Sequence, residues 1–527
     1  MWSKARYFQL VHPNERAPMP GPNVIVILAD DLGYSDIGCF GGEIATPNID
    51  RLASEGVRLN AFYNTARCSP SRASLLTGRH PHEIGVGILN DDDRPWGYPG
   101  SMSLDHRTMA EYFKEHGYST YLSGKWHLSA DTATPNETWP TRRGFDGFYG
   151  ILAGANSYFA PKGLYRNEEL LPTPSDPDYY FTDAVTDHAV DFIRGNAADD
   201  EPFFLYLAYT APHWPLQAPE EDVERYLETF APGWDVLREQ RLERLVAAGV
   251  LPAGTTLSQR DPTQPAWDDA PDQEWEARRM AVYAAQVERM DVGIGRVLDA
   301  LASAGAADDT LVMFLSDNGP SAESLPPRDA PLFSKRQPDR ARDGRPVQVG
   351  NRPEITPGAE DTYASYGRAW ANLSNVPFRL YKRWVHEGGI ATPLLARWPR
   401  GGLAVSSLVD TPFQLTDILP TVLEAAGIDT AAQPGISMLG ELRGVETVTG
   451  HTLFWEHMGN CAVRLGDNKA VKTPETGWEL YDLASDRGEE HDLAVVYPEV
   501  VDELVAAWEA WAAGAGVIPW ETYGPPK

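Results

Sequence analysis

The stretch Val24-Ile25-Val26-Ile27-Leu28-Ala29-Asp30-Asp31 decides the fold class, because six apolar residues run directly into two carboxylates. The same pattern occurs three more times: Tyr118–Leu122 precedes Gly124-Lys125-Trp126-His127, Pro202–Tyr209 precedes Pro212-His213-Trp214, and Leu311–Leu315 precedes Ser316-Asp317-Asn318-Gly319. Such continuous apolar runs are typical of strands buried on both faces of a parallel sheet covered by helices. Because ligands bind beyond the carboxyl ends of strands in these sheets, we expect the four polar clusters to form one site.

Helical segments are expected between these runs, and the chain changes character near residue 435. The predicted helices are Pro47–Glu55 with Thr46 as N-cap, Val236–Ala248 and Met280–Leu301. Later, alternating runs at Thr452–Glu456, Cys461–Leu465 and Trp478–Leu483 predict a small antiparallel sheet, with a helix at Pro498–Trp511 over it. The predicted fold is α/β: a large mixed, mostly parallel sheet sandwiched by helices over residues 20–434, and a smaller α+β domain over 435–527.

Two stretches look irregular. Pro215–Glu276 is rich in proline, tryptophan and acidic residues around the helix predicted at Val236–Ala248, and Ser321–Glu360 is polar, rich in proline and arginine, and shows little periodicity. A structureless loop of that length is unusual in a folded domain unless it is functional. We interpret residues 321–360 as a rim or lid over the site.

The net charge disfavours two classes of partner. The chain of 527 residues has 45 Lys and Arg against 75 Asp and Glu, a formal charge of −30, which disfavours binding to nucleic acid or to an anionic membrane.

The three widely spaced cysteines, Cys39, Cys68 and Cys461, do not form a disulfide framework and fit a reducing compartment. Residues 1–22 are polar and lack the apolar core of a signal peptide, so the sequence predicts a cytoplasmic protein.

Two pairs of polar residues, Asp30-Asp31 and Asp317-Asn318, follow predicted strands. Each pair alone is more often a solvated turn than a ligand set. Together they offer three carboxylates and an amide carbonyl, the hard oxygen ligands that Ca²⁺ and Mg²⁺ prefer. Because clustering three carboxylates without a cation is costly, we expect a divalent metal here.

The segment from Asn64 to Arg79 contains a cysteine, Cys68, just before a helix that we expect to begin at Pro70. A simple interpretation is a buried structural cysteine. A thiol at a helix N-terminus, beside Arg67 and Arg72, would instead have a lowered pKa and face the positive end of the helix dipole. That arrangement suits a nucleophile that handles an anion.

Cys68-Ser69-Pro70-Ser71-Arg72, followed by Leu76-Thr77-Gly78-Arg79, resembles the signature of the type I sulfatases, the formylglycine-dependent branch of the alkaline-phosphatase-like superfamily. The similarity continues through the four strand-end clusters, through Thr46–Leu52, and through Lys382 with Glu387-Gly388-Gly389-Ile390. Within the family the chain looks most like bacterial arylsulfatases, on Arg278–Ala285, Gly367–Phe378 and Glu479–Leu483.

This resemblance implies a sulfuric ester hydrolase of the arylsulfatase type, which cleaves small-molecule sulfate monoesters to an alcohol or phenol and inorganic sulfate. It implies that a formylglycine-generating enzyme oxidises Cys68 to 3-oxoalanine (Cα-formylglycine), whose hydrate is the nucleophile. It further implies one calcium ion bound by Asp30, Asp31, Asp317, Asn318 and the modified residue 68.

The resemblance also assigns catalytic roles. Arg72 and Lys125 would hold the diol of residue 68, and His213 and Lys382 would protonate the leaving alcohol or stabilise its charge. His127 would take a proton from the covalent sulfate ester, so that it collapses to the aldehyde and expels sulfate. Two alternatives remain open: a phosphate or phosphonate ester hydrolase of the same superfamily, and a non-catalytic sulfate-ester binder in which Cys68 stays a thiol.

Overall fold

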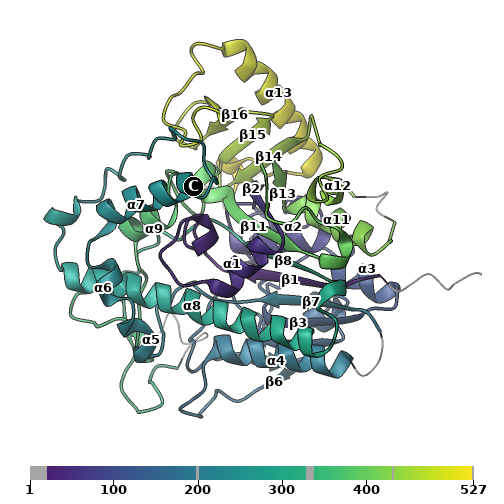
Figure 1. Ribbon diagram of the computed structural model, residues 1–527, viewed down its shortest axis with the longest axis vertical. Helices are drawn as coiled ribbons and strands as arrows, with labels where there is room; N and C mark the ends of the chain where they lie inside the picture. The colour runs from purple at the N-terminus through teal and green to yellow at the C-terminus, as the bar shows by residue number, and fades with distance from the viewer. Residues whose placement is uncertain (1–20, 198–200, 328–337, 430–432, 525–527) are drawn as a thin grey trace, which may run out of the picture.

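The computed structural model describes residues 21–197, 201–327, 338–429 and 433–524 (Figure 1). Its largest element is a mixed eleven-stranded sheet, in the order β12-β2-β11-β8-β1-β7-β3-β4-β5-β6, with β13 also paired to β2. Strands β8, β1, β7, β3 and β4 are successive parallel neighbours, whereas β11 is antiparallel to both β2 and β8. The expected large, mixed and mostly parallel sheet is therefore confirmed. The strands are β1 Asn23–Ala29, β2 Val57–Tyr63, β3 Ser119–Lys125, β4 Gly147–Ile151, β5 Leu164–Arg166, β6 Glu169–Leu170, β7 Phe203–Ala208, β8 Thr310–Ser316, β11 Ala391–Arg397, β12 Ser407–Val409 and β13 Phe413–Gln414.

Helices cover both faces of this sheet, and alternate residues of β1 show how. Ile25 and Ile27 pack in one core with apolar residues of α1, α4 and α8. Val24, Val26 and Leu28 pack in a second core with α2, α3 and α11. Because both faces are buried, the strand reads as an unbroken apolar run, which is why its sequence predicted this layering. The helices are α1 Pro47–Ser54, α2 Cys68–Thr77, α3 Met109–Glu115, α4 Phe181–Asn196, α5 Glu220–Glu224, α6 Leu227–Phe230, α7 Trp234–Ala247, α8 Gln273–Ser303, α9 Arg368–Ser374, α10 Glu387–Ile390, α11 Ile418–Ala425, α12 Leu439–Leu442 and α13 Pro498–Ala515.

Several helix termini differ from the expectations by a few residues, most clearly those of α8 and α2. Helix α8 begins at Gln273 rather than Met280, because its first turns are mostly polar and carry no apolar periodicity. Helix α2 begins at Cys68 rather than Pro70. Thr46 is the N-cap residue of α1, as expected, but its hydroxyl accepts a hydrogen bond from the Gly38 N–H at 2.8 Å and makes no hydrogen bond to the backbone of the helix.

The two irregular stretches contain more structure than their composition indicates. The first includes the short helices α5 and α6 as well as α7. The second includes β9 (Gln348–Val349), which pairs with β10 (Thr362–Tyr363), while residues 328–337 lie outside the described residues. Its role as a rim or lid stays a prediction.

A four-stranded antiparallel sheet follows, at the upper end of the molecule in Figure 1. Its strands are β14 Thr452–His457, β15 Asn460–Leu465, β16 Asn468–Lys472 and β17 Glu479–Asp482. On one face Val463, Ala470 and Leu480 pack against α13. On the other face Trp455 and Val471 join the core of the large sheet. The C-terminal sheet is thus built onto the part that contains the large sheet, and the domain boundary at residues 434 and 435 stays a prediction.

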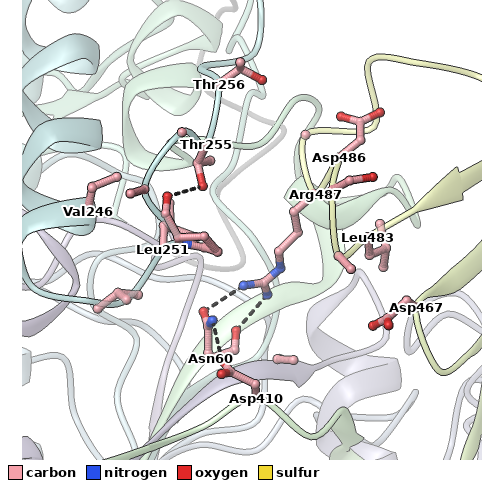
Figure 2. A pocket seen from close by; sticks show the side chains of 18 of the residues that line it. Asn60, Val246, Leu251, Thr255, Thr256, Asp410, Asp467, Leu483, Asp486 and Arg487 are labelled. Atoms are coloured by element: carbon pink, nitrogen blue, oxygen red, sulfur yellow. Dashed lines mark hydrogen bonds between the residues drawn. The ribbon is translucent and has the colours of Figure 1, made fainter.

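A buried cluster of charges lies at this junction. Lys469 Nζ of β16 is 3.0 Å from Glu387 Oε1 and 2.8 Å from Glu489 Oε1, and all three side chains are fully buried. Close by, a pocket of about 740 Å³ separates residues 246–256 from residues 483–488 (Figure 2). In that view Arg487 reaches across to Asn60, donating to its backbone carbonyl and to Oδ1 at 2.7 Å each. Polar contacts as well as apolar packing therefore join the two parts.

None of the helices in the described ranges has the length and apolarity needed to span a bilayer. The prediction that the N-terminal segment is no signal peptide concerns mainly residues 1–20, which lie outside the described residues.

Candidate active site

The four polar clusters meet at one edge of the large sheet, because β8, β1, β7 and β3 are adjacent and parallel. Asp317 follows β8, Asp30 and Asp31 follow β1, and His213 follows β7. Lys125 is the last residue of β3. The structure thus brings together side chains that are almost 300 positions apart in the chain.

Asp30 and Asp31 form ion pairs with different lysines. Lys125 Nζ lies 2.6 Å from Asp30 Oδ2, and both side chains are fully buried. Lys382 Nζ lies 2.7 Å from Asp31 Oδ1, and Asn318 Nδ2 donates to the same oxygen at 2.6 Å. Asp31 has a left-handed backbone with φ +67°, a conformation that is strained for a residue with a side chain and recurs at functional sites.

Arg72 of helix α2 holds the third carboxylate. Its Nε and Nη2 donate to Asp317 Oδ2 at 3.0 and 2.7 Å, and its Nη1 donates to the backbone carbonyl of Lys125 at 3.1 Å. Although burial opposes it, the pKa of Arg72 is raised by Asp317 and by other groups around it. The guanidinium therefore ties β8 to the end of β3, and its expected contact with a diol on residue 68 stays a prediction.

Several oxygens of this cluster fit a divalent cation. Asp30 Oδ1 and Asn318 Oδ1 are buried and accept no hydrogen bond from any described residue. The ligand atoms of Asp30, Asp31 and His213 lie within 4.8 Å of one another. Burial, followed by the neighbouring Asp317, raises the pKa of Asp30, as expected for carboxylates gathered away from water. A hard cation would supply the missing partner for these oxygens.

Cys68 begins helix α2 and is buried. Burial opposes it, but Asp31 and then Cys68 raise the pKa of Lys382 above its usual value. Lys382 therefore lies close enough to Cys68 for their charges to interact. Arg67, the N-cap residue of the helix, interacts with Cys68 in the same way. The residue expected to be the nucleophile is therefore surrounded by positive charge in a strongly acidic protein.

Two histidines complete the predicted set. The His213 Nδ1–H donates to the carbonyl of Trp214 at 2.6 Å, so Nε2 faces Asp31 Oδ2 at 3.4 Å. Burial, and then Lys382 and Lys125, lower the pKa of His213 well below its usual value. His127 follows β3 with φ +60°, and its ring lies over Gly154, where an added Cβ would clash with Nε2.

Three residues of the site were assigned no role from the sequence. Ser316, the last residue of β8, belongs to a quoted cluster but was given no function. Its Oγ accepts from the Leu32 N–H at 3.1 Å and donates to the Asn318 carbonyl at 3.0 Å, fixing two ligand-bearing turns against each other. Glu323 pairs with Arg67 at 3.1 Å and accepts from Trp214 Nε1 at 2.8 Å. Gly154 provides the space for the His127 ring. Glu323 and Gly154 belong to loops without a motif, so only the fold reveals their place.

Comparisons with known proteins agree with this arrangement. The family model for sulfatases matches residues 22–428. An uncharacterized sulfatase of Schizosaccharomyces pombe is 35% identical over 547 residues, which cover 96% of either chain. An arylsulfatase of Klebsiella aerogenes is 35% identical over 443 residues, covering 80% of this chain and 90% of that protein. The crystal structure of Ps i-CgsB in complex with k-i-k-neocarrahexaose is similar with a TM-score of 0.69 and 26% identity, over 95% of this chain and 94% of the other.

Proposed function

The chain belongs to the sulfatase family and hydrolyses sulfate esters, and we propose that it does so with the hydrated aldehyde formed from Cys68. The observation that carries this proposal is the position of Cys68. It begins a buried helix, beside the cations Arg67, Arg72 and Lys382, at the sheet edge where three carboxylates converge. A sulfate monoester is an anion, so its attack requires this local excess of positive charge.

Calcium is the divalent ion that we propose for the site. Asp30, Asp31, Asp317 and Asn318, with residue 68, would hold it through oxygen atoms. When bound, the ion supplies positive charge to the sulfate oxygens and balances the carboxylates. The two buried oxygens without hydrogen-bond partners, Asp30 Oδ1 and Asn318 Oδ1, support this assignment.

The chain's own side chains divide the remaining work. Lys125 and Arg72 fix the carboxylates Asp30 and Asp317 at 2.6 and 2.7 Å, which keeps the site rigid around residue 68. Lys382 has a raised pKa, so it stays protonated and offers charge to the oxygen of the departing alcohol. His213 lies on the same side through its contact with Asp31.

His127 is the base that we propose for the second half of the reaction. Hydration of the aldehyde gives residue 68 two hydroxyls, one to attack sulfur and one to lose its proton afterwards. Removal of that second proton re-forms the carbonyl and breaks the bond between the side-chain carbon of residue 68 and the ester oxygen, which leaves as part of the sulfate. A cysteine or serine at position 68 has no second hydroxyl, so the sulfated enzyme would be trapped. A formylglycine-generating enzyme is therefore the maturation partner that we propose.

The mass of the tryptic peptide Cys68–Arg72 tests the nucleophile directly. We expect the aldehyde or its hydrate in active protein. If fully active enzyme contained only the thiol, the proposal would be wrong. If an inactive preparation contains the intact thiol, the chain would be co-expressed with the maturation enzyme and its activity measured again. The alternative of a non-catalytic sulfate-ester binder predicts that the protein stays inactive.

A second measurement separates sulfate from phosphate chemistry. The values of kcat/KM for 4-nitrophenyl sulfate and 4-nitrophenyl phosphate are compared on one preparation. We expect the sulfate to be preferred, and a large preference for phosphate would favour the phosphohydrolase alternative instead.

A further inference from the structure

A positively charged pocket of about 540 Å³ opens beside Lys382. Its lining includes five cationic side chains against only two carboxylates, although the whole chain carries a formal charge of −30. The cations are Arg67, Arg279, Arg368, Lys382 and Arg383, and the carboxylates are Glu276 and Glu323. Because Lys382 also contacts Asp31, the pocket adjoins the reaction centre on the side of the leaving group.

Four of the five cations already have an acidic partner. The pairs are Arg67 with Glu323 at 3.1 Å, Arg279 with Glu276 at 3.1 Å, Arg368 with Asp261 at 3.7 Å, and Lys382 with Asp31 at 2.7 Å. Arg383 differs, since it makes no ion pair with any of the described residues and its side chain is exposed. The pocket therefore presents one cation whose charge is not compensated by any residue that the structure describes.

The backbone holds Arg383 in a defined position. Its φ is +90°, a left-handed conformation that is unfavourable for a residue with a side chain. The Arg383 N–H donates to the Ala66 carbonyl at 2.8 Å, which anchors it two positions before Cys68. Its guanidinium lies over the ring of Trp384, with Cζ 5.9 Å from the ring centroid. The strained turn thus places an unpaired cation and an aromatic ring together at the mouth of the site.

We infer that this pocket selects sulfate esters whose leaving group carries a second negative charge, with Arg383 as the residue that recognises it. The inference rests on the proposed function and specifies its substrate class. A planar carboxylate or a second sulfate would form charge-assisted hydrogen bonds with the guanidinium fork. The ring that bears this group would lie against Trp384. The residual positive charge of the pocket would attract the same substrates from solution.

The test compares two aryl sulfates that differ only in charge, 4-carboxyphenyl sulfate and its uncharged amide, 4-carbamoylphenyl sulfate. The readout is the ratio of their kcat/KM values in wild type, Arg383→Gln and Arg383→Lys. We expect the glutamine variant to lower the ratio roughly three- to tenfold, mainly through KM, as for loss of one partly exposed ion pair. The lysine variant should restore part of it. Added salt should lower the wild-type ratio, because it screens the interaction.

Arg400→Gln is the matched control, since Arg400 is an exposed arginine outside the pocket and pairs with Asp309. It should leave the ratio unchanged. The inference is overturned if Arg383→Gln slows both esters equally, or if its ratio equals that of wild type, while its thermal unfolding matches wild type. If wild-type enzyme with an oxidised residue 68 hydrolyses neither ester nor 4-nitrophenyl sulfate, the proposed function itself fails. Turnover of the amide without any preference for the carboxylate refutes only the selectivity.

Discussion

Replacing Lys469 by methionine would test how the C-terminal sheet is joined to the catalytic part. The substitution keeps most of the side-chain volume and removes the charge. Lys469 Nζ is 3.0 Å from Glu387 and 2.8 Å from Glu489, and none of the three side chains is exposed. The variant would therefore leave two carboxylates in the protein interior with less counter-charge.

The expected cost follows from this burial. Removing one partner of a fully buried ion pair leaves an uncompensated charge and typically destabilises a protein by about 3–5 kcal/mol. Arg487, whose Nε lies 3.4 Å from Glu387 Oε2, remains and should hold the loss at the lower end of that range. The matched control is Lys114→Met, because Lys114 pairs with Asp146 at 2.6 Å but the two side chains are 49% and 39% exposed. For that surface pair we expect about 0–1 kcal/mol.

Urea unfolding followed by tryptophan fluorescence would measure both variants, with the free energy taken from the midpoint and the slope. The effect should also depend on pH. Burial opposes it, but Lys469, then Arg487 and Arg464, lower the pKa of Glu387 below its usual 4.5. A depressed pKa stabilises the folded state above pH 4.5, and this contribution is lost as the pH falls through the folded-state pKa. The difference in the free energy of unfolding between wild type and Lys469→Met should therefore become smaller below pH 4.5.

If Lys469→Met lowered the free energy of unfolding at pH 7 as little as Lys114→Met does, the buried cluster would contribute little net stability and the reasoning from burial would be refuted. If the difference in the free energy of unfolding between wild type and Lys469→Met grew on acidification, the lowered pKa of Glu387 would be contradicted.

Four further predictions concern the active site. Cys68→Ala should lower turnover of 4-nitrophenyl sulfate by more than about a thousandfold without changing the circular dichroism spectrum, because it removes the nucleophile; substantial residual turnover would count against that role. Chelation should abolish activity and lower the melting temperature, and added Ca²⁺ should reverse both, since an ion at 100 times its Kd stabilises the fold by about 2.7 kcal/mol; full activity after dialysis against chelator would exclude a catalytic metal. His127→Ala should accumulate sulfated enzyme, detectable by intact mass after a short reaction, and a variant that is slow but never sulfated would assign His127 to the first step. Gly154→Ala should lower kcat by about 10–100-fold, because its Cβ would displace the His127 ring; unchanged kcat would show that the ring position is not critical.

The local chemistry of the site was predictable where a strand and its polar cluster are contiguous. The run from Val24 to Asp31 indicates both that β1 is buried on its two faces and that carboxylates lie at its end. Parallel strands all present their carboxyl ends at one edge, so the meeting of Asp30, Lys125, His213 and Asp317 follows from the pattern. Lys382 lies on no such strand, and only the resemblance to a family singled it out.

Other features depend on contacts that no local pattern encodes. Strand β11 enters the sheet antiparallel between β2 and β8, and nothing in its apolar run specifies that direction. Strand β16 was not predicted, since the run from Asn468 to Lys472 holds only two adjacent apolar residues; both are buried because each face of the sheet is covered. The hydrogen bonds from Arg72 to Asp317 join residues 245 positions apart, so this arginine's actual partner could not be read from its helix.

The burial of helix α2 also limits when Cys68 can be modified during synthesis. All ten residues from Cys68 to Thr77 are buried in the folded chain, so the maturation enzyme that we propose would need to reach Cys68 earlier. Asp317, which closes over Arg72, emerges 245 residues later. At about 5–20 residues per second, a ribosome needs roughly 10–50 s to add that length. During that interval the nascent chain can still expose Cys68 for modification. The rate of synthesis should therefore influence the fraction of the protein that is modified and active.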